Sequence, residues 1–220
     1  MLTWFALGLL AVALALSVRW LLRPRDSLGR EKAFPLISVL VLAALGAGLL
    51  VPVVRHHRLE GRLTDVATTL VGARATVHCQ TAGRELMDLG TELGYVKWGP
   101  QGVPEHETLI KRAPCNHLAA YLRGDHARPS QQEIIAVHVL SHESRHMAGT
   151  TDEAVTECQA MQRDAWTARL LGASPEEALA LVHSYWLTVY PRMPDDYRTG
   201  ECSPGGPLDE HLTDAPWGTG

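Results

Sequence analysis

The sequence His142-Glu143-Ser144-Arg145-His146 is an H-E-x-x-H motif within a segment whose apolar residues follow helical spacing. Residues four apart lie on one face of a helix, so His142 and His146 can present two imidazoles to one metal ion. Glu143 follows the first of them, where its carboxylate can take a proton from a metal-bound water. The motif therefore predicts a metal site with hydrolytic chemistry.

The motif lies in the second half of a well-bounded predicted helix. Residues 131–141 carry apolar side chains at helical spacing and contain no glycine or proline. Ser130 is a predicted N-cap with Glu133 as its capping-box partner, and Gly149 follows closely after the second histidine. We therefore expect one helix over about 131–148.

A catalytic zinc needs three protein ligands and one open position. Glu153 lies at the start of the next predicted helix, about 152–172, and is the expected third ligand. Asp152 in the same turn is the alternative ligand. Glu157, one turn further along, can accept the free N–H of a ligand histidine. A capping box between Thr150 and Glu153 would instead account for Glu153 without a metal.

The motif and the segment Asp152-Glu153-Ala154-Val155-Thr156-Glu157 together resemble the gluzincin class of zinc metallopeptidases. The likeness covers about residues 131–160, and the very short link between the two helices is closest to compact, minigluzincin-like proteins. This resemblance implies a zincin-like domain with a small sheet before the motif helix, whose edge strand is available to an extended peptide.

The same resemblance implies a role for each residue of the motif. Zn²⁺ would be bound by His142, His146 and Glu153. Glu143 would be the general base, and Glu157 would orient a ligand histidine.

Three further residues are weighed as parts of the site. Similar peptidases use a histidine or tyrosine from later in the chain to stabilise the oxyanion, and His183 is the expected catalytic candidate, ahead of Tyr190. His138 shares the face of the motif histidines. It is about 12 Å from His146 along an ideal helix, so we expect it to pack beside the site.

Two uncharged apolar stretches precede the motif region. Each is long enough to cross a bilayer, which takes about 20 helical residues. A secretory signal peptide is the alternative for the first stretch, but it would begin with basic residues that are missing here. We expect residues 1–54 to form a transmembrane hairpin in the lipid bilayer, with spans at about 2–22 and 34–54.

Basic residues set the expected orientation in the cell membrane. The connector between the spans contains Arg19, Arg23, Arg25, Arg30 and Lys32. Such a cluster stays on the cytoplasmic side by the positive-inside rule. The chain after the second span would then be extracytoplasmic.

The exported part is expected to have an α+β fold. Residues 55–72 are predicted as a juxtamembrane helix or linker, and residues 73–192 as a mainly helical, zincin-like metallopeptidase domain with a small β-sheet. Residues 193–220 are rich in Pro, Gly, Asp and Thr and are predicted as an irregular tail.

All four cysteines follow the second span, which indicates two disulfides in an oxidising compartment. Three pairings are possible, and the sequence does not choose among them. We expect Cys79–Cys115 and Cys158–Cys202, the second of which would tie the tail to the helix that carries Glu157.

The sequence therefore predicts a membrane-anchored, zinc-dependent peptidase that acts on peptides or proteins outside the cell membrane. The alternative is a non-catalytic, zinc-stabilised, membrane-tethered module for binding or assembly, with a peptidase-like fold. The net charge is −4, and no basic stripe with interleaved aromatics occurs, so we expect no nucleic-acid partner.

Overall fold

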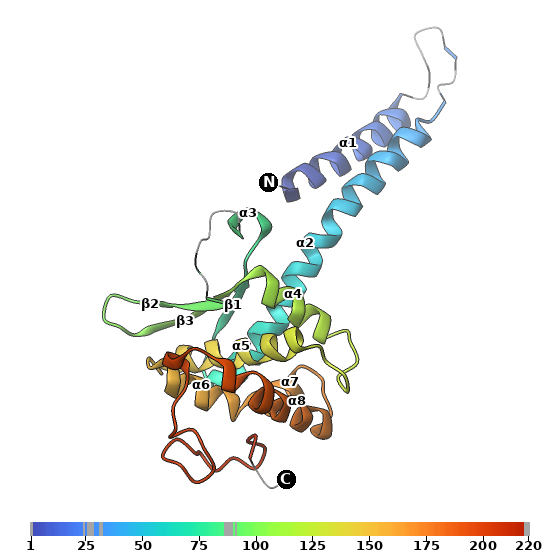
Figure 1. Ribbon diagram of the computed structural model, residues 1–220. Coiled ribbons are helices and arrows are strands. Elements are labelled where there is room, and N and C mark those ends of the chain that lie inside the picture. Colours follow the sequence, from blue (N-terminus) through green and yellow to red (C-terminus); the bar gives the residue numbers. More distant parts are fainter. Residues whose placement is uncertain are drawn as a thin grey trace. The chain divides into compact units, whose positions relative to one another are not determined.

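The computed structural model describes residues 2–23, 25, 29–30, 33–85, 90 and 92–217 (Figure 1). The chain forms two compact units, Met1–Arg58 and Leu59–Gly220. The architecture is α+β, as expected, with a helical majority and one small sheet.

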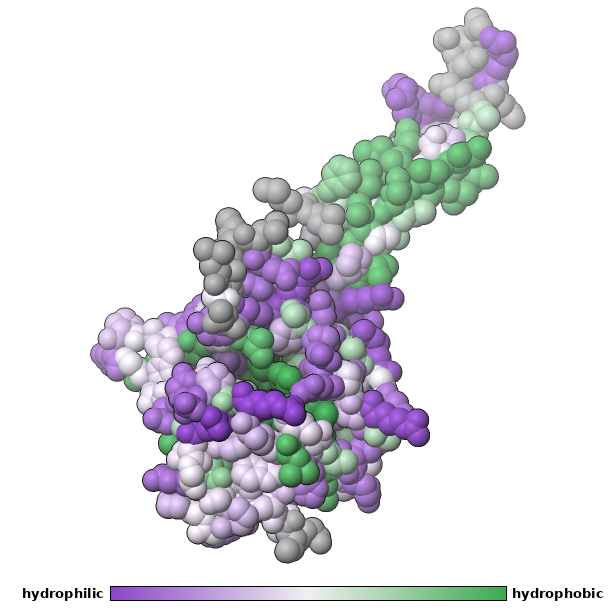
Figure 2. Space-filling view, viewed as in Figure 1, coloured by the Kyte–Doolittle hydropathy of each residue, from purple (hydrophilic) through white to green (hydrophobic). Residues whose placement is uncertain are grey.

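The first unit contains α1 (Leu2–Leu22) and the first part of α2 (Leu36–Val71). Stretches of these helices reach mean hydropathies of 2.1 and 2.6, and both helices are long enough to span a membrane. Figure 2 shows the hydrophobic surface along them. Such a surface is stable in an apolar environment and costly in water.

The two apolar helices approach closely at one glycine. A Cβ atom at Gly46 would lie 2.8 Å from Leu10 Cγ and 3.1 Å from the carbonyl oxygen of Ala6. Small residues permit such contacts between helices that cannot rely on the hydrophobic effect within a bilayer. Gly48, on the same helix, has no such neighbour within 4 Å.

The second unit begins inside α2. Its core includes Leu63, Val66, Ala67 and Leu70, which follow the i, i+3, i+4, i+7 spacing of an amphipathic helix. The segment 55–72 is therefore helical up to Val71, and its last part is built into the core rather than leading to it. The folded unit starts earlier than the boundary at residue 73 that the sequence led us to expect.

The sheet has the strand order β1-β3-β2. Its strands are β1 (Thr76–Cys79), β2 (Gly94–Trp98) and β3 (Pro104–Ile110). β1 runs parallel to β3, whereas β2 is antiparallel to β3 and lies at an edge. A short helix, α3 (Ala82–Glu85), follows β1.

The remaining helical elements follow the sheet along the chain. They are α4 (Arg112–Tyr121), α5 (Gln131–Met147), α6 (Glu153–Met161), α7 (Asp164–Leu170), α8 (Pro175–Thr188) and the 3₁₀ turns η1 (Tyr190–Arg192) and η2 (Asp195–Tyr197). α5 carries the motif and contacts β2, β3, α4, α6, α7 and α8. It is thus the central helix of the unit, and the capping box of Ser130 and Glu133 fixes its start.

The helix expected over 152–172 is divided into α6 and α7. At the break, the side chain of Gln162 donates to the carbonyl oxygens of Cys158 and Leu208, at 3.1 and 2.9 Å. It also accepts from the backbone N–H of Glu210 at 2.8 Å. These bonds anchor the C-terminal tail at the point where the helix ends.

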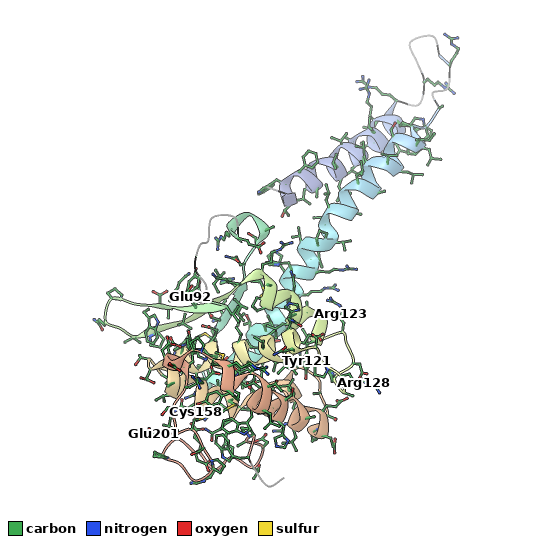
Figure 3. All side chains as sticks on the ribbon, in the orientation of Figure 1. Glu92, Tyr121, Arg123, Arg128, Cys158 and Glu201 are labelled. Carbon is green, nitrogen blue, oxygen red and sulfur yellow. A yellow bond between two sulfur atoms is a disulfide. The ribbon has the colours of Figure 1, made fainter. Side chains whose placement is uncertain are left out.

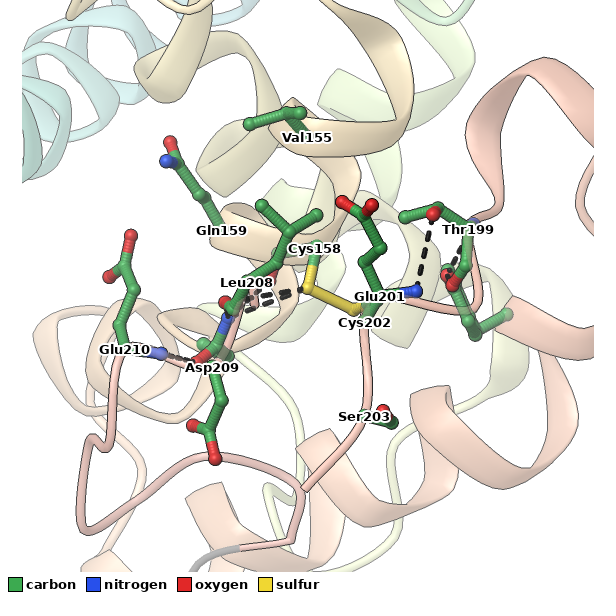
Figure 4. Close-up of a disulfide and its surroundings, with 12 residues drawn as sticks. Val155, Cys158, Gln159, Thr199, Glu201, Cys202, Ser203, Leu208, Asp209 and Glu210 are labelled. Carbon is green, nitrogen blue, oxygen red and sulfur yellow. Dashed lines mark hydrogen bonds between the residues drawn. A yellow bond between two sulfur atoms is a disulfide. The ribbon is translucent and has the colours of Figure 1, made fainter. Parts of the chain in front are cut away.

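Two disulfides confirm the expected pairing. Cys79–Cys115 joins β1 to α4, and Cys158–Cys202 joins α6 to the tail (Figure 4). Figures 3 and 4 both show Cys158 close to Glu201 in the tail. The tail lacks long regular elements, as expected, yet it packs against the core through residues such as Leu208.

Candidate metal centre

Three ligand atoms converge at the end of α5. His142 Nε2 lies 3.0 Å from His146 Nε2 and 3.2 Å from Glu153 Oε2, and the third side of the triangle is 3.3 Å. Tetrahedral zinc with bonds of about 2.0–2.1 Å separates its ligand atoms by about 3.3 Å. The triangle therefore has nearly the size of one face of a tetrahedral zinc site.

The short link between α5 and α6 makes this convergence possible. Gly149 adopts φ 107°, a left-handed conformation that suits glycine and lets the chain reverse directly after the helix. The first turn of α6 then lies beside the last turn of α5, so Glu153 reaches the two histidines. A longer insertion is not needed to bring the third ligand into place.

The outer nitrogen of each motif histidine is fixed by an acceptor. His146 Nδ1 lies 2.8 Å from the carbonyl oxygen of Thr150, and His142 Nδ1 lies 3.1 Å from Glu157 Oε2. Neither oxygen is a donor, so both Nδ1 atoms carry protons. A neutral imidazole with its proton on Nδ1 presents a lone pair at Nε2.

Three acceptors, two Nε2 lone pairs and a Glu153 oxygen, thus face one another. This arrangement is repulsive unless a cation or a proton lies among them. Burial alone would lower the pKa of His142, but hydrogen bonds with Glu153 and Glu157 raise it to about 9. Hydrogen bonds with His142 and His146 lower the pKa of Glu153 to about 2. The geometry therefore favours a positive charge at this point.

Glu157 links the site to a buried network. Besides His142, it contacts His138 Nε2 at 2.9 Å through Oε2, and its Oε1 accepts from the Tyr185 hydroxyl at 2.5 Å. His138 Nδ1 lies 2.8 Å from Asp164 Oδ2. Burial alone would lower the pKa of His138, but the two carboxylates overcome this and raise it to about 10. His138 is therefore packed beside the site and donates from both ring nitrogens.

His138, His142 and Glu157 also lie close enough together to hold a metal. In this buried group, however, each nitrogen faces a carboxylate oxygen, so two N–H donors satisfy the contacts. In the group of His142, His146 and Glu153, the contacts are satisfied only if an added proton or a cation lies among the two Nε2 atoms and the Glu153 oxygen. This group is therefore the stronger candidate for a metal site, and Glu157 is placed to orient His142.

Glu143 points from α5 toward the sheet and is only 4% exposed. Its Oε2 lies 3.3 Å from the hydroxyl of Thr108 on β3, which also donates to the Tyr95 carbonyl at 3.0 Å. A Cβ atom at Gly94 would lie 2.8 Å from Glu143 Oε1, so the strand leaves room for this carboxylate only by having glycine there. Burial raises the pKa of Glu143.

Asp152, the alternative ligand, has another role. It is the N-cap of α6, and its Oδ1 accepts from the backbone N–H of Val155 at 2.9 Å. The capping box between Thr150 and Glu153 does not form, which leaves Glu153 free to face the histidines.

The structure does not bring His183 into this cluster. His183 is exposed on α8, whereas Tyr185 on the same helix is buried against Glu157. Tyr190 is also elsewhere, since its hydroxyl bonds with the carbonyl oxygen of Thr199 at 3.3 Å.

Sequence reasoning missed Tyr197, which lies in the tail on η2. Its ring centroid is 5.8 Å from that of His142. Burial and the nearby carboxylate of Glu153 raise the pKa of Tyr197 to about 12. Cys202 is the only sequence signal that could have pointed to it, because the disulfide with Cys158 brings this part of the tail to α6.

No protein-family model, curated protein or solved structure matches this chain. The assignment of the site therefore rests on its own geometry. The resemblance to gluzincins remains one of motif, over about residues 131–160.

Substitutions at Glu153 and at Asp152 should show which of the two carboxylates is the third metal ligand. Glu153→Gln is expected to weaken zinc binding by at least about 100-fold, the upper end of what outer partners of metal ligands contribute. Asp152→Asn should change it by less than about threefold, since Asn caps a helix as well as Asp does. Competition with a chromophoric chelator measures both affinities. The opposite ranking would show that Asp152 is the ligand.

Zinc binding should release protons. The pKa of His142 is about 9 in the metal-free protein, so at neutral pH a proton must leave before Nε2 can bind zinc. The apparent affinity should therefore rise by about tenfold per pH unit up to about pH 9 and then level off. Calorimetry in buffers of different ionisation enthalpy counts the protons. An affinity that is flat below pH 9 would contradict the assignment.

Proposed function

We propose that the protein is a membrane-anchored, zinc-dependent peptidase that hydrolyses peptide bonds on the extracytoplasmic side. The observation that carries this proposal is the convergence of His142, His146 and Glu153 at tetrahedral spacing, with Glu143 on the same helix. Two imidazole nitrogens and one carboxylate oxygen form a donor set that suits zinc.

The exposure of the ligands favours a catalytic over a structural metal. Structural zinc sites are closed by four protein ligands, whereas catalytic sites have three and an open position. The described residues supply three ligand atoms to this group. The side chain of Glu153 is 39% exposed, which gives solvent and substrate a route to the centre.

Bound zinc would polarise the peptide carbonyl and acidify water at its open position. Glu143 would accept a proton from that water and pass it to the leaving amine. Burial raises the pKa of Glu143 toward neutral pH. A group that acts first as a general base and then as a general acid works best when its pKa is near the working pH. Thr108 would hold one oxygen of Glu143 in place.

Tyr197 replaces His183 in the proposed mechanism. Its raised pKa keeps the hydroxyl protonated at neutral pH, so the hydroxyl can donate a hydrogen bond. Its ring centroid lies 5.8 Å from that of His142. We assign it to the carbonyl oxygen of the substrate, where negative charge develops.

A non-catalytic, zinc-stabilised module remains the alternative function. Burial of Glu143 argues against it, because a buried carboxylate with one long hydrogen bond lowers stability relative to an apolar side chain. Gly94 preserves the space for that carboxylate. A purely structural metal site has no use for either residue.

The proposed topology follows from the apolar helices and the cysteines. Arg19 lies in the last turn of α1, and Arg23, Arg25 and Arg30 follow in the connector to α2; these residues favour the cytoplasmic side, while Lys32 lies outside the described residues. Disulfides persist in oxidising compartments. Both disulfides lie in the second unit, which supports an extracytoplasmic position for that unit.

The strand β2 is proposed to receive the substrate. It is at the edge of the sheet and contacts α5. An extended peptide can pair with the backbone of such an edge, and this places its carbonyls in a fixed register.

Glu143→Gln should abolish peptide hydrolysis and leave zinc bound. A general base contributes about 10²–10⁴-fold, so kcat is expected to fall by at least about 100-fold. Glu105→Gln, on the exposed side of β3, serves as the control and should retain full activity. Turnover of a fluorogenic peptide library and the zinc content are measured on the same samples. Undiminished turnover in Glu143→Gln would show that another group is the base.

Tyr197→Phe should lower kcat and spare KM. Loss of one donor to an oxyanion typically costs about 10²–10³-fold in kcat, because the bond is made mainly in the transition state. Steady-state kinetics on one cleaved peptide, with Tyr95→Phe as the control, measures this. A rise in KM at constant kcat would instead assign Tyr197 to substrate binding.

A further inference from the structure

The edge strand β2 runs along the whole motif. At one end, the backbone of Gly94 is pressed against Glu143. At the other end, the ring of Trp98 lies 6.4 Å from the ring of His146, edge to face at 77°. The pairing of β2 with β3 shifts register between Val96 and Trp98, so the side of the strand that Trp98 faces is given by its ring contact with His146 on α5.

The side chain of Trp98 is exposed to solvent. It is 40% exposed although it contacts a metal ligand. Val103, across the hairpin turn, is also exposed, and its carbonyl oxygen accepts from Gly99 at 2.9 Å. A large aromatic side chain that stays exposed beside polar residues is typical of surfaces that bind a ligand.

Two aromatic rings therefore flank the metal ligands. Trp98 borders the His146 side, and Tyr197 borders the His142 side. The rings differ in polarity at the tip. Tyr197 offers a hydroxyl, whereas the Trp98 ring offers mainly apolar surface.

The opposite face of the sheet argues against a lipid surface as the occupant. Lys97, next to Trp98, points to that other face and forms an ion pair with Glu107. Glu107 also faces His78 at 3.8 Å. Tyr95 lies on this charged face as well, so the exposed aromatics of β2 do not form one continuous apolar patch.

We propose that Trp98 is a specificity-determining residue, and that the site takes extended peptides with a large apolar or aromatic side chain next to the scissile bond, packed on the Trp98 ring. This inference rests on the proposed peptidase function. The backbone of the peptide pairs with β2, and one of its side chains falls on the Trp98 side of the zinc.

Cleavage sites in a peptide library first identify the position next to the scissile bond at which large apolar side chains are preferred. The test then compares two fluorogenic peptides that are identical except for Phe or Ala at that position. The zinc-loaded full chain in detergent should prefer Phe. Trp98→Ala should lower kcat/KM for the Phe peptide by at least about tenfold and change the Ala peptide by less than about twofold.

Two control variants separate specificity from folding. Tyr95→Ala removes an aromatic of similar exposure, 44%, from the other face of the same strand, and it should leave the preference unchanged. Trp98→Phe should retain most of the preference, because it keeps an apolar ring. Equal loss on both peptides in Trp98→Ala, with normal zinc content, would overturn the inference.

A binding assay distinguishes failure of this inference from failure of the proposed function. Peptide hydroxamates bind zinc without turnover, so Phe and Ala hydroxamates can be compared in a protein that cleaves nothing. Tighter binding of the Phe compound by at least about tenfold, lost in Trp98→Ala, would support the inference even if hydrolysis is absent. No difference between the compounds, or an effect of Trp98→Ala only on binding to anionic vesicles, would refute it.

Discussion

The fixed tautomers of two histidines are the constraint on which the structure of the site depends. The carbonyl of Thr150 and the carboxylate of Glu157 hold the Nδ1 protons, so His142 and His146 direct their lone pairs at each other and at Glu153. Three acceptors within 3.3 Å repel one another unless a cation or a proton lies among them. The fold helps to fix the orientation of the two histidine rings, because the motif lies on the central helix α5, where each ring is packed.

The same region contains more buried polar groups than stability alone would favour. His138, Glu157 and Asp164 are nearly inaccessible, and each would be costly without its partners. Their hydrogen bonds spread the charge away from the metal ligands and orient His142 through Glu157. Glu143 differs from these groups, because burial raises its pKa and its described hydrogen bond is a long one, 3.3 Å from the hydroxyl of Thr108. A buried carboxylate with a raised pKa is suited to accepting and donating protons.

Local patterns made the motif helix and the convergence of His142, His146 and Glu153 predictable. The capping residue Ser130 and the turn at Gly149 bound α5. Helical spacing brings His142 and His146 together, and the turn at Gly149 brings Glu153 within reach of them. Tyr197 was not predictable, because only the disulfide and the packed tail carry it to the site. The break in the helix after α6 was missed for a similar reason. Gln162 ends that helix through bonds to the tail, and such long-range contacts leave no local signal.

X-ray absorption at the zinc edge tests the central claim most directly. The full chain with one equivalent of zinc should show four light-atom ligands at about 2.0–2.1 Å, two of them with the scattering of imidazole. His146→Ala should lose one imidazole contribution, because that ring is one of the two. Sulfur at about 2.3 Å, six oxygen ligands, or a spectrum unchanged by His146→Ala would contradict the account.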